Sequence, residues 1–129
     1  MAEKAAVRTE EAPAPFQGSP YSQAIHAGGL VFVSGQVGLA PGAPELVGEG
    51  IAEQTEQVFA NLRAILEAAG SGLDRIVKTT VYLRNLDDFE AMNEVYRKHV
   101  GDVPPARATV EVAALPAGAL IEIDAIALA

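Results

Sequence analysis

The chain of 129 residues carries 9 Lys or Arg against 17 Asp or Glu, for a formal net charge of −8, and contains no cysteine. This length favours a single domain, and the acidic balance without any Lys/Arg cluster argues against nucleic-acid binding. The lack of cysteine excludes disulfides, thiol catalysis and cysteine-based zinc sites, and no apolar run approaches the roughly 20 residues of a membrane span.

Half of the residues are apolar, and the mean hydropathy of +0.20 is high for so small a domain. Small domains leave much of their surface exposed, so part of this apolar content is expected to be buried between subunits. The N-terminus, Met-Ala-Glu-Lys, has no signal-peptide core, and the expected compartment is the cytoplasm.

Residues 1–17 are rich in Ala, Glu and Pro and show no periodicity. They are predicted to form a flexible N-terminal tail, ordered at most near Phe16, ahead of a single domain over residues 18–129. A targeting or docking peptide is the alternative interpretation of this segment.

A hairpin is predicted directly after the tail. The bend at residues 18–21 delivers Tyr21 and leads into strands over residues 22–27 and 30–36, joined by the two-residue turn Gly28-Gly29. The second strand ends at Ser34-Gly35-Gln36, where a small residue and a glycine allow a ligand to come close to the backbone. A β-bulge or a strand-end turn explains the same residues equally well.

The clearest predicted element is an amphipathic helix over residues 51–69, followed by Gly70 where a left-handed residue ends a helix. The loop before it, residues 40–50, has room for a short strand at 45–47. A strand rich in Val, Thr and Tyr follows at residues 76–83 and is expected to be covered on both faces. The apolar stripe of the helix, assigned to the core, consists of Ile51, Thr55, Val58, Phe59, Leu62, Ile65, Leu66 and Ala69.

A second helix is predicted from Asp87, the N-cap of a capping box with Glu90, to about His99. Asn93 lies one step off the apolar stripe of this helix. Because asparagine is a mediocre helix former, Asn93 either faces solvent or has a polar task. The stripe itself, expected to be buried, consists of Phe89, Met92, Tyr96 and Val100.

The segment 104–112 places an isolated arginine at the start of a strand. Two prolines form a stiff lead-in, after which Arg107, Thr109 and Glu111 alternate with apolar residues. No other Lys or Arg lies between Lys98 and the C-terminus. A guanidinium presents five donors in a fixed fork that matches a carboxylate. Arg107 is therefore a candidate carboxylate-binding residue, and pairing with Glu111 on an exposed strand is the alternative.

A final strand over residues 120–128 carries two carboxylates on one face. Ile121 and Ile123 flank Glu122, which predicts a low dielectric, a raised pKa and a proton-handling role for this glutamate. An exposed strand face is the alternative for both carboxylates and is preferred for Asp124.

These elements predict an α+β domain in which two helices cover one face of a mixed sheet. The other face carries enough Val, Ile and Ala to need a cover, and packing sheet against sheet in a homo-oligomer would supply one. His26 and His99 are the only histidines and lie far apart in the sequence, so no metal site is expected. Ser34 lacks the flanks of a nucleophile elbow and no phosphate-binding glycine loop is present, so the sequence supports neither a cofactor nor a covalent mechanism.

Five segments, in this order, resemble the Rid (reactive intermediate deaminase) family, whose best-known branch is the RidA enamine/imine deaminases. No single segment is specific, but together they span the chain from about Glu10 to Leu128. The resemblance implies a chorismate-mutase-like α+β fold, a homotrimer and active sites between subunits. The segments are Ser-Pro-Tyr at 19–21, Val-Ser-Gly-Gln at 33–36, Ile-Val-Lys-Thr-Thr-Val-Tyr at 76–82, Pro-Ala-Arg at 105–107 and Ile-Glu-Ile-Asp-Ala-Ile-Ala at 121–127.

The resemblance also implies a reaction: cofactor-free hydrolysis of 2-imino acids, reached from enamines such as 2-aminoacrylate, to 2-keto acids and ammonia. The small-molecule substrates it implies are 2-iminopropanoate and 2-iminobutanoate. In this scheme Arg107 holds the substrate carboxylate, Glu122 positions the attacking water, and Tyr21 or backbone groups near Gly35 stabilise developing charge. The further substrate contacts that it implies fall on Ser34, Gly35, Asn93 and Thr109.

Two departures indicate a non-archetypal subgroup. RidA-type members usually carry a cysteine where this chain has Thr109, and the tyrosine-bearing bend, Gly-Ser-Pro-Tyr at 18–21, is one residue longer. A non-catalytic trimer that binds 2-keto acids is the alternative function; it shares Arg107 and differs at Glu122 and Tyr21. An RNA-cleaving translation inhibitor, as some relatives have been described, is disfavoured by the net charge of −8.

Overall fold

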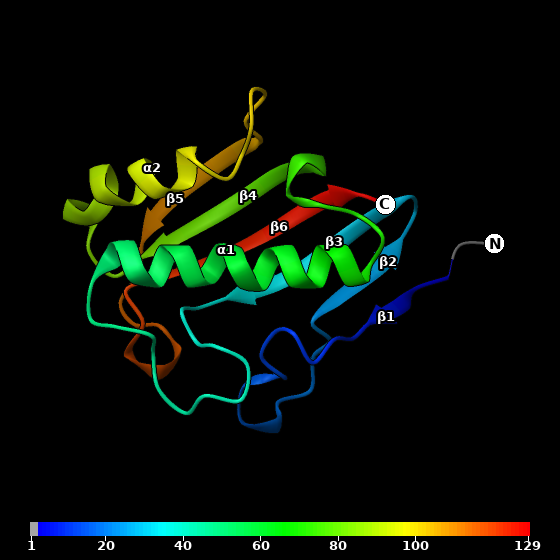
Figure 1. Ribbon diagram of the computed structural model, residues 1–129, viewed down its shortest axis with the longest axis horizontal. Helices are drawn as coiled ribbons and strands as arrows, with labels where there is room; N and C mark the ends of the chain where they lie inside the picture. Colours follow the sequence, from blue (N-terminus) through cyan, green and yellow to red (C-terminus); the bar gives the residue numbers. More distant parts are fainter. Residues whose placement is uncertain (1–2) are drawn as a thin grey trace.

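A six-stranded sheet in the order β1-β2-β3-β6-β4-β5 forms the centre of the computed structural model, which describes residues 3–129. Neighbouring strands are antiparallel except β4 and β5, which are parallel because α2 crosses between them. Both helices, α1 (Ile51–Ala68) and α2 (Phe89–Arg97), lie on the same face of the sheet (Figure 1). The predicted α+β architecture is confirmed. The strands are β1 (Ala5–Val7), β2 (Ala24–Ala27), β3 (Leu30–Gln36), β4 (Ile76–Leu83), β5 (Ala106–Glu111) and β6 (Ile121–Leu128).

Helix α1 packs its apolar stripe on the sheet and ends as predicted. Gly70 has φ +80°, and the Ser71 N–H donates to the Leu66 carbonyl over 2.8 Å, which satisfies an end carbonyl of the helix. Burying several large aliphatic side chains, each worth about 1.5–3 kcal/mol, holds the helix in place. The fully buried members of the stripe are Thr55, Val58, Phe59, Leu62, Ile65 and Leu66.

Two buried polar residues of α1 fix the loop that precedes it. Asn61 donates to the carbonyls of Val37 and Leu39 over 3.1 and 2.9 Å. Gln54 donates to the Gly48 carbonyl over 2.8 Å. The short strand expected at 45–47 is not formed; only an isolated bridge joins Leu39 to Leu46. The loop is ordered by side chains of the helix instead.

The predicted hairpin is present, with β2 starting at Ala24 rather than at residue 22. Gly28 and Gly29 both have positive φ, 60° and 78°, as a two-residue primed turn requires. Between β3 and β6 the register shifts from Val33 to Gln36, so Ser34 and Gly35 form a β-bulge.

The segment before Gly18 contains a short strand, where the sequence analysis expected no regular structure. β1 pairs with β2, and Val7 and Ala12 are buried. The buried Gln23 side chain accepts from the Thr9 N–H over 2.8 Å and donates to the Pro13 carbonyl over 2.8 Å. One glutamine thus provides the backbone partners that the proline-rich segment cannot provide for itself.

Helix α2 begins differently from the prediction. Asn85, not Asp87, caps the preceding 3-10 turn, because its side chain accepts from the Asp87 N–H over 2.9 Å. The helix ends at Arg97, two residues before the predicted end, and Gly101 follows with φ +73°. The expected apolar stripe is buried, with Phe89 partly exposed.

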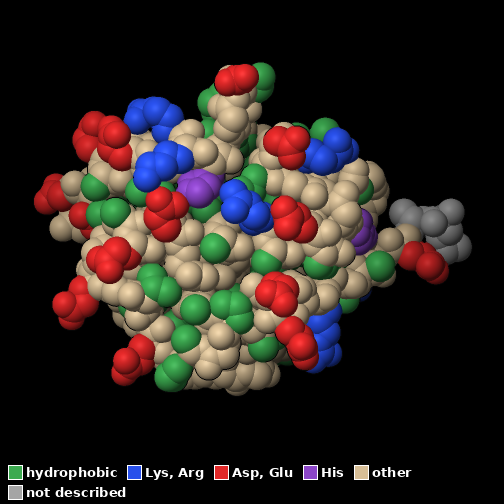
Figure 2. Space-filling view, viewed as in Figure 1, with side chains coloured by type: hydrophobic (Ala, Val, Ile, Leu, Met, Phe, Trp, Pro, Cys, Tyr) green, Lys and Arg blue, Asp and Glu red, His purple; other side chains and the backbone are tan. Residues whose placement is uncertain are grey.

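The sheet face away from the helices is uncovered in the protomer. Phe32, Val110 and Leu128 are 41–43% exposed, and Tyr82 of β4 is partly exposed, so the expectation that β4 is covered on both faces is not met within one chain. On the helix-bearing face, acidic and basic side chains are interspersed (Figure 2). No helix within residues 3–129 is long and apolar enough to cross a membrane.

Candidate functional site

The strand register separates the predicted site residues onto two faces of the sheet. In the β4–β5 pair, Arg107 lies opposite Thr79, which is fully buried beneath the helices. In the β4–β6 pair, Glu122 lies opposite Tyr82 on the other face. Because side chains alternate along a strand, Arg107 and Glu122 lie on opposite faces of one protomer's sheet.

Arg107 is surrounded by side chains of α2. Its Nη1 donates to Oδ1 of Asn93 over 2.8 Å, so the polar task is the correct interpretation of Asn93. Its Cζ lies 4.7 Å from the ring centroid of Tyr96 and 5.5 Å from that of Phe89. We refer to Arg107, Asn93, Phe89, Tyr96 and Thr79 as the arginine cluster. Thr109, the other predicted contact on β5, lies two residues further along the same face.

No carboxylate neutralises Arg107 within residues 3–129, because none of their ion pairs includes it. The alternative partner, Glu111, instead accepts from the Leu86 N–H over 2.9 Å. A partly buried guanidinium that is anchored by a neutral amide keeps its charge and most of its donors for another group. Such a site favours a small anion, above all a carboxylate.

The second group lines a cavity of about 470 Å³ beside the bulge of β3. Tyr21, Ser34, Gly35 and Glu122 are all part of its wall, and we refer to them as the glutamate cleft. The rest of the wall is mostly apolar and consists of Pro13, Ala14, Phe16, Ser19, Gln36, Val37, Leu39 and Pro116.

Gly35 and Glu122 fit together across the β3–β6 pair. A Cβ atom at position 35 would lie 2.7 Å from Cδ of Glu122, so the glycine leaves the space that this side chain occupies. Burial raises the pKa of Glu122, and the charge of Asp124 on the same face raises it further. A raised pKa of Glu122 is also what the sequence predicts. A carboxylate with a raised pKa is suited to moving a proton near neutral pH.

Hydrogen bonds orient the two hydroxyl groups of the cleft. The Tyr21 hydroxyl accepts from the Phe16 N–H over 2.6 Å, which leaves its own proton available to a ligand. The Ser34 hydroxyl donates to the Ser22 carbonyl over 2.6 Å. Ser34 is thereby committed to the backbone, while Tyr21, 42% exposed, donates its hydroxyl proton to no group within residues 3–129.

The sequence predicts no place at the site for three residues that neighbour Arg107 or Glu122. Phe89 and Tyr96 were assigned to the core stripe, although their spacing with Asn93, at i, i+4 and i+7, could have indicated one face turned toward β5. Asp124 was assigned to an exposed strand, yet it accepts from the Tyr82 hydroxyl over 3.2 Å and acts on Glu122. No cluster of three His, Cys, Asp or Glu that could hold a metal occurs in the described part of the chain.

Comparison with known proteins places the chain in a family. The profile of the family described as Endoribonuclease L-PSP matches residues 9–129. The chain is 50% identical to a RutC family protein of Pyrococcus horikoshii over 124 residues, which cover 96% of this chain and 97% of that protein. It is 44% identical over 122 residues to the 2-iminobutanoate/2-iminopropanoate deaminase of Mus musculus, covering 95% and 89% of the two chains.

A solved structure agrees with these sequence matches. The crystal structure of RidA from the Antarctic bacterium Psychrobacter sp. PAMC 21119 superposes with a TM-score of 0.91 at 45% identity, and the match covers 97% of this chain and 99% of that one. The two folds are therefore the same over nearly their whole length. The chain belongs to the Rid family, whose members are also described as RutC family proteins and endoribonuclease L-PSP.

Proposed function

We propose that this protein hydrolyses reactive 2-imino acids, such as 2-iminopropanoate and 2-iminobutanoate, to 2-keto acids and ammonia. The observation that carries the proposal is Arg107, a partly buried guanidinium held by a neutral asparagine and paired with no acid within residues 3–129. Relatives named for this reaction, such as the mouse deaminase, supply the substrate class.

The active site is completed between subunits. A single protomer holds Arg107 and Glu122 on opposite faces of its sheet, so it cannot apply both to one small substrate. A homotrimer that packs the uncovered sheet faces inward brings the arginine cluster of one subunit to the glutamate cleft of the next. Exposed Phe32, Val110 and Leu128 on that face support such packing.

Substrate binding starts at the carboxylate. Arg107 donates to both carboxylate oxygens, because one guanidinium N–H is already directed at Asn93 and the remaining donors form a fork. The imino carbon then lies toward the glutamate cleft, where the mostly apolar wall accepts a short side chain. An enamine such as 2-aminoacrylate enters the reaction after it tautomerises to the imine.

Glu122 directs the water. Its carboxylate takes a proton as the water oxygen bonds to the imino carbon, and the imino nitrogen takes up a proton, which gives a carbinolamine. The hydroxyl then passes its proton through Glu122 to the amino nitrogen, the C–N bond breaks with its electron pair leaving on nitrogen as ammonia, and the keto group is formed. Tyr21 and backbone N–H groups near Gly35 stabilise the charge that develops on oxygen.

The direct test is product release. 2-Aminoacrylate is generated enzymatically, and keto acid and ammonia are measured with and without the protein. We expect clear acceleration over the spontaneous hydrolysis of the imine. If the protein binds 2-oxobutanoate but leaves the rate of hydrolysis unchanged, it is a binding protein for keto acids and the proposal is wrong.

A further inference from the structure

We propose that Tyr96 and Phe89 are positioning residues for Arg107: their rings hold the guanidinium flat against α2, so that its free edge is set for a carboxylate before any ligand arrives. This inference rests on the proposed role of Arg107 as the carboxylate-binding residue. Neither ring is placed to react with the substrate, and both act through the arginine.

The geometry of α2 provides the support. Phe89, Asn93 and Tyr96 follow one another along a single helix face that is turned toward β5. The ring of Tyr96 lies 4.7 Å and that of Phe89 5.5 Å from Cζ of Arg107, within the range of an attractive cation–π contact. Asn93 adds one in-plane hydrogen bond of 2.8 Å. Two rings and an amide therefore restrict both the position and the plane of the guanidinium.

Tyr96 is itself immobilised by the core. It is 5% exposed, its ring meets the edge of Phe59 at 5.4 Å and 81°, and its hydroxyl shares a 2.7 Å hydrogen bond with Thr79. Thr79 is fully buried and lies directly opposite Arg107 in the β4–β5 register. The arginine thus rests on a ring that is fixed from two sides by residues of the interior.

This arrangement has a kinetic consequence. Arginine is a long side chain with considerable rotamer entropy. A guanidinium that is already held in its binding orientation loses less of this entropy when a carboxylate binds. The carboxylate is held equally in the ground state and the transition state, so loosening the arginine weakens binding uniformly. Loss of the ring should therefore raise KM and leave kcat nearly unchanged.

The experiment compares Tyr96→Leu and Tyr96→Phe in the full-length protein. With 2-iminobutanoate as substrate, we expect Tyr96→Leu to raise KM about tenfold with kcat nearly unchanged. Tyr96→Phe keeps the ring under the guanidinium and should stay within about threefold of the wild-type KM. The matched control is Val31→Ala, which removes buried apolar volume on β3, with β6 and β4 between it and β5; it should lower the melting temperature and leave KM unchanged.

A second readout does not depend on turnover. In protein labelled with ¹⁵N-arginine, the Arg107 Nε–Hε signal should be shifted by the ring currents of the wild-type protein and should move toward that of free arginine in Tyr96→Leu. If the wild type lacks deaminase activity, the proposed function fails, and this signal alone decides whether the rings position Arg107.

Two results would overturn the inference. One is a folded Tyr96→Leu protein with wild-type KM and an unmoved Arg107 signal. The other is an equal rise of KM in Val31→Ala, which would mean that any damage to the core has the same effect. Where Tyr96→Leu does not fold, Phe89→Leu, at a less buried position, decides by the same two readouts.

Discussion

Glu122 is a residue whose surroundings disfavour its charge. It lies partly buried at the bulge of β3, in the space left by Gly35, with Asp124 on the same face and no cation paired with it among residues 3–129. A carboxylate with a folded-state pKa above its ordinary value favours the folded state while protonated. That contribution is present below the ordinary value of 4.5 and is lost as the pH rises through the raised pKa.

We expect Glu122→Gln to lower turnover about 10²-fold or more, the scale of a lost general base, while binding of 2-oxobutanoate persists. Because glutamine carries no charge to desolvate, the variant should be at least as stable as the wild type at pH 7 and lose any advantage near pH 4. Steady-state kinetics, calorimetric titration and urea unfolding at both pH values check this. Glu67→Gln, at an exposed position on α1, is the control and should change neither the turnover nor the stability. Unchanged turnover with weaker ligand binding would favour a binding protein.

Two substitutions of Arg107 distinguish the contribution of its positive charge from that of the shape of its guanidinium. Arg107→Ala removes a charge-assisted bidentate contact, and we expect a loss of about 3–5 kcal/mol in kcat/KM. Arg107→Lys keeps the charge but not the fork, and it should fold and assemble yet lose most of the activity. Arg63→Lys on the exposed side of α1 is the matched control. Near-full turnover of Arg107→Lys would mean that only positive potential is needed at this position.

The sequence indicates the residue types of the candidate site but not how the fold arranges them. The isolated arginine, the glutamate between two isoleucines and the off-stripe Asn93 could each be recognised from their local pattern. Local patterns do not report which strands are neighbours. Only the β4–β5 and β4–β6 registers separate Arg107 from Glu122, because pairing between distant segments decides which face each side chain occupies.

At the scale of elements, a strong hydrophobic periodicity is sufficient to predict a helix or strand from the sequence, and a weak periodicity is not. The α1 stripe and the β4 run lie where the sequence predicted them, since each buries a continuous apolar face. β1 was missed because three residues carry too little pattern, and the segment after it is ordered by the side chain of Gln23, a contact between distant residues. The α2 cap was misplaced because Asn85 and Asp87 are both good capping residues, and a 3-10 turn separates the cap from the helix.

A charged contact joins the two helices at their outer side. Glu56 of α1 accepts from His99 over 2.6 Å and from Lys98 over 3.1 Å, just after α2, and the His99 ring stacks on Phe59 at 4.6 Å. The hydrogen bond from His99, and then that from Lys98, lowers the pKa of Glu56 below its ordinary value of 4.5. A depressed carboxylate pKa contributes stability above 4.5 that is lost as the pH falls through the folded-state value.

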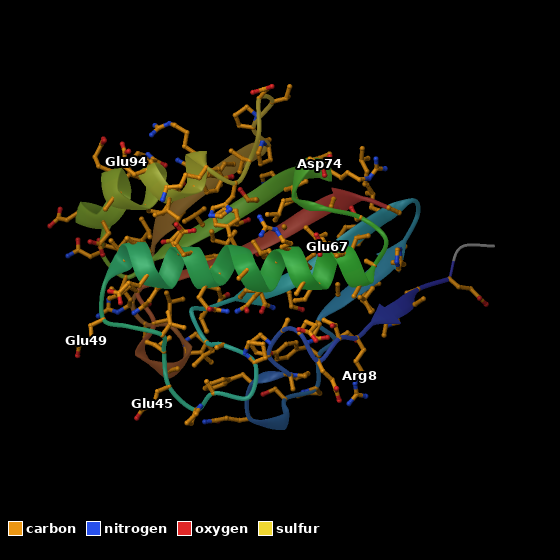
Figure 3. All side chains as sticks on the ribbon, viewed as in Figure 1. Arg8, Glu45, Glu49, Glu67, Asp74 and Glu94 are labelled. Atoms are coloured by element: carbon orange, nitrogen blue, oxygen red, sulfur yellow. The ribbon has the colours of Figure 1, made fainter. Side chains whose placement is uncertain are left out.

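We expect Glu56→Gln to destabilise the protein at pH 7 by less than about 1 kcal/mol, because the Glu56 side chain is 45% exposed and solvent screens the pair. The difference from the wild type should shrink as the pH falls below 4.5 and the wild-type carboxylate takes up its proton. Urea unfolding across this range measures it. Glu94→Gln is the control: Glu94 projects outward (Figure 3), and among residues 3–129 it pairs only with the exposed Arg97. A difference that does not shrink as the pH falls would mean that packing, not charge, links the helices.

At the scale of the whole molecule, the proposed assembly explains both the uncovered sheet face and the separation of Arg107 and Glu122 onto opposite faces. Exposed apolar side chains on that face disfavour a monomer in water, and each protomer presents an arginine cluster and a glutamate cleft that it cannot combine. The proposed cyclic assembly would satisfy both at once, since every interface of a ring is the same and each would pair one cluster with one cleft.

Light scattering at micromolar concentration should therefore give a mass near three times 13.4 kDa. A monomeric mass would contradict both the assembly and the shared site. Mass alone does not show which residues meet across the interface, and complementation between inactive variants does. Arg107→Ala and Glu122→Gln subunits are unfolded, mixed in equal amounts and refolded together, with each variant refolded alone as the control.

In the mixed rings, an interface that takes Arg107 from a Glu122→Gln subunit and Glu122 from an Arg107→Ala subunit contains every native group. Random assembly gives this arrangement at about a quarter of the interfaces, so we expect roughly a quarter of wild-type activity from two preparations that are each nearly inactive. If instead both residues of one protomer served the same substrate, every site would carry one mutation and mixing would recover nothing. The size of the recovery therefore reports whether the two faces of neighbouring sheets form one active site.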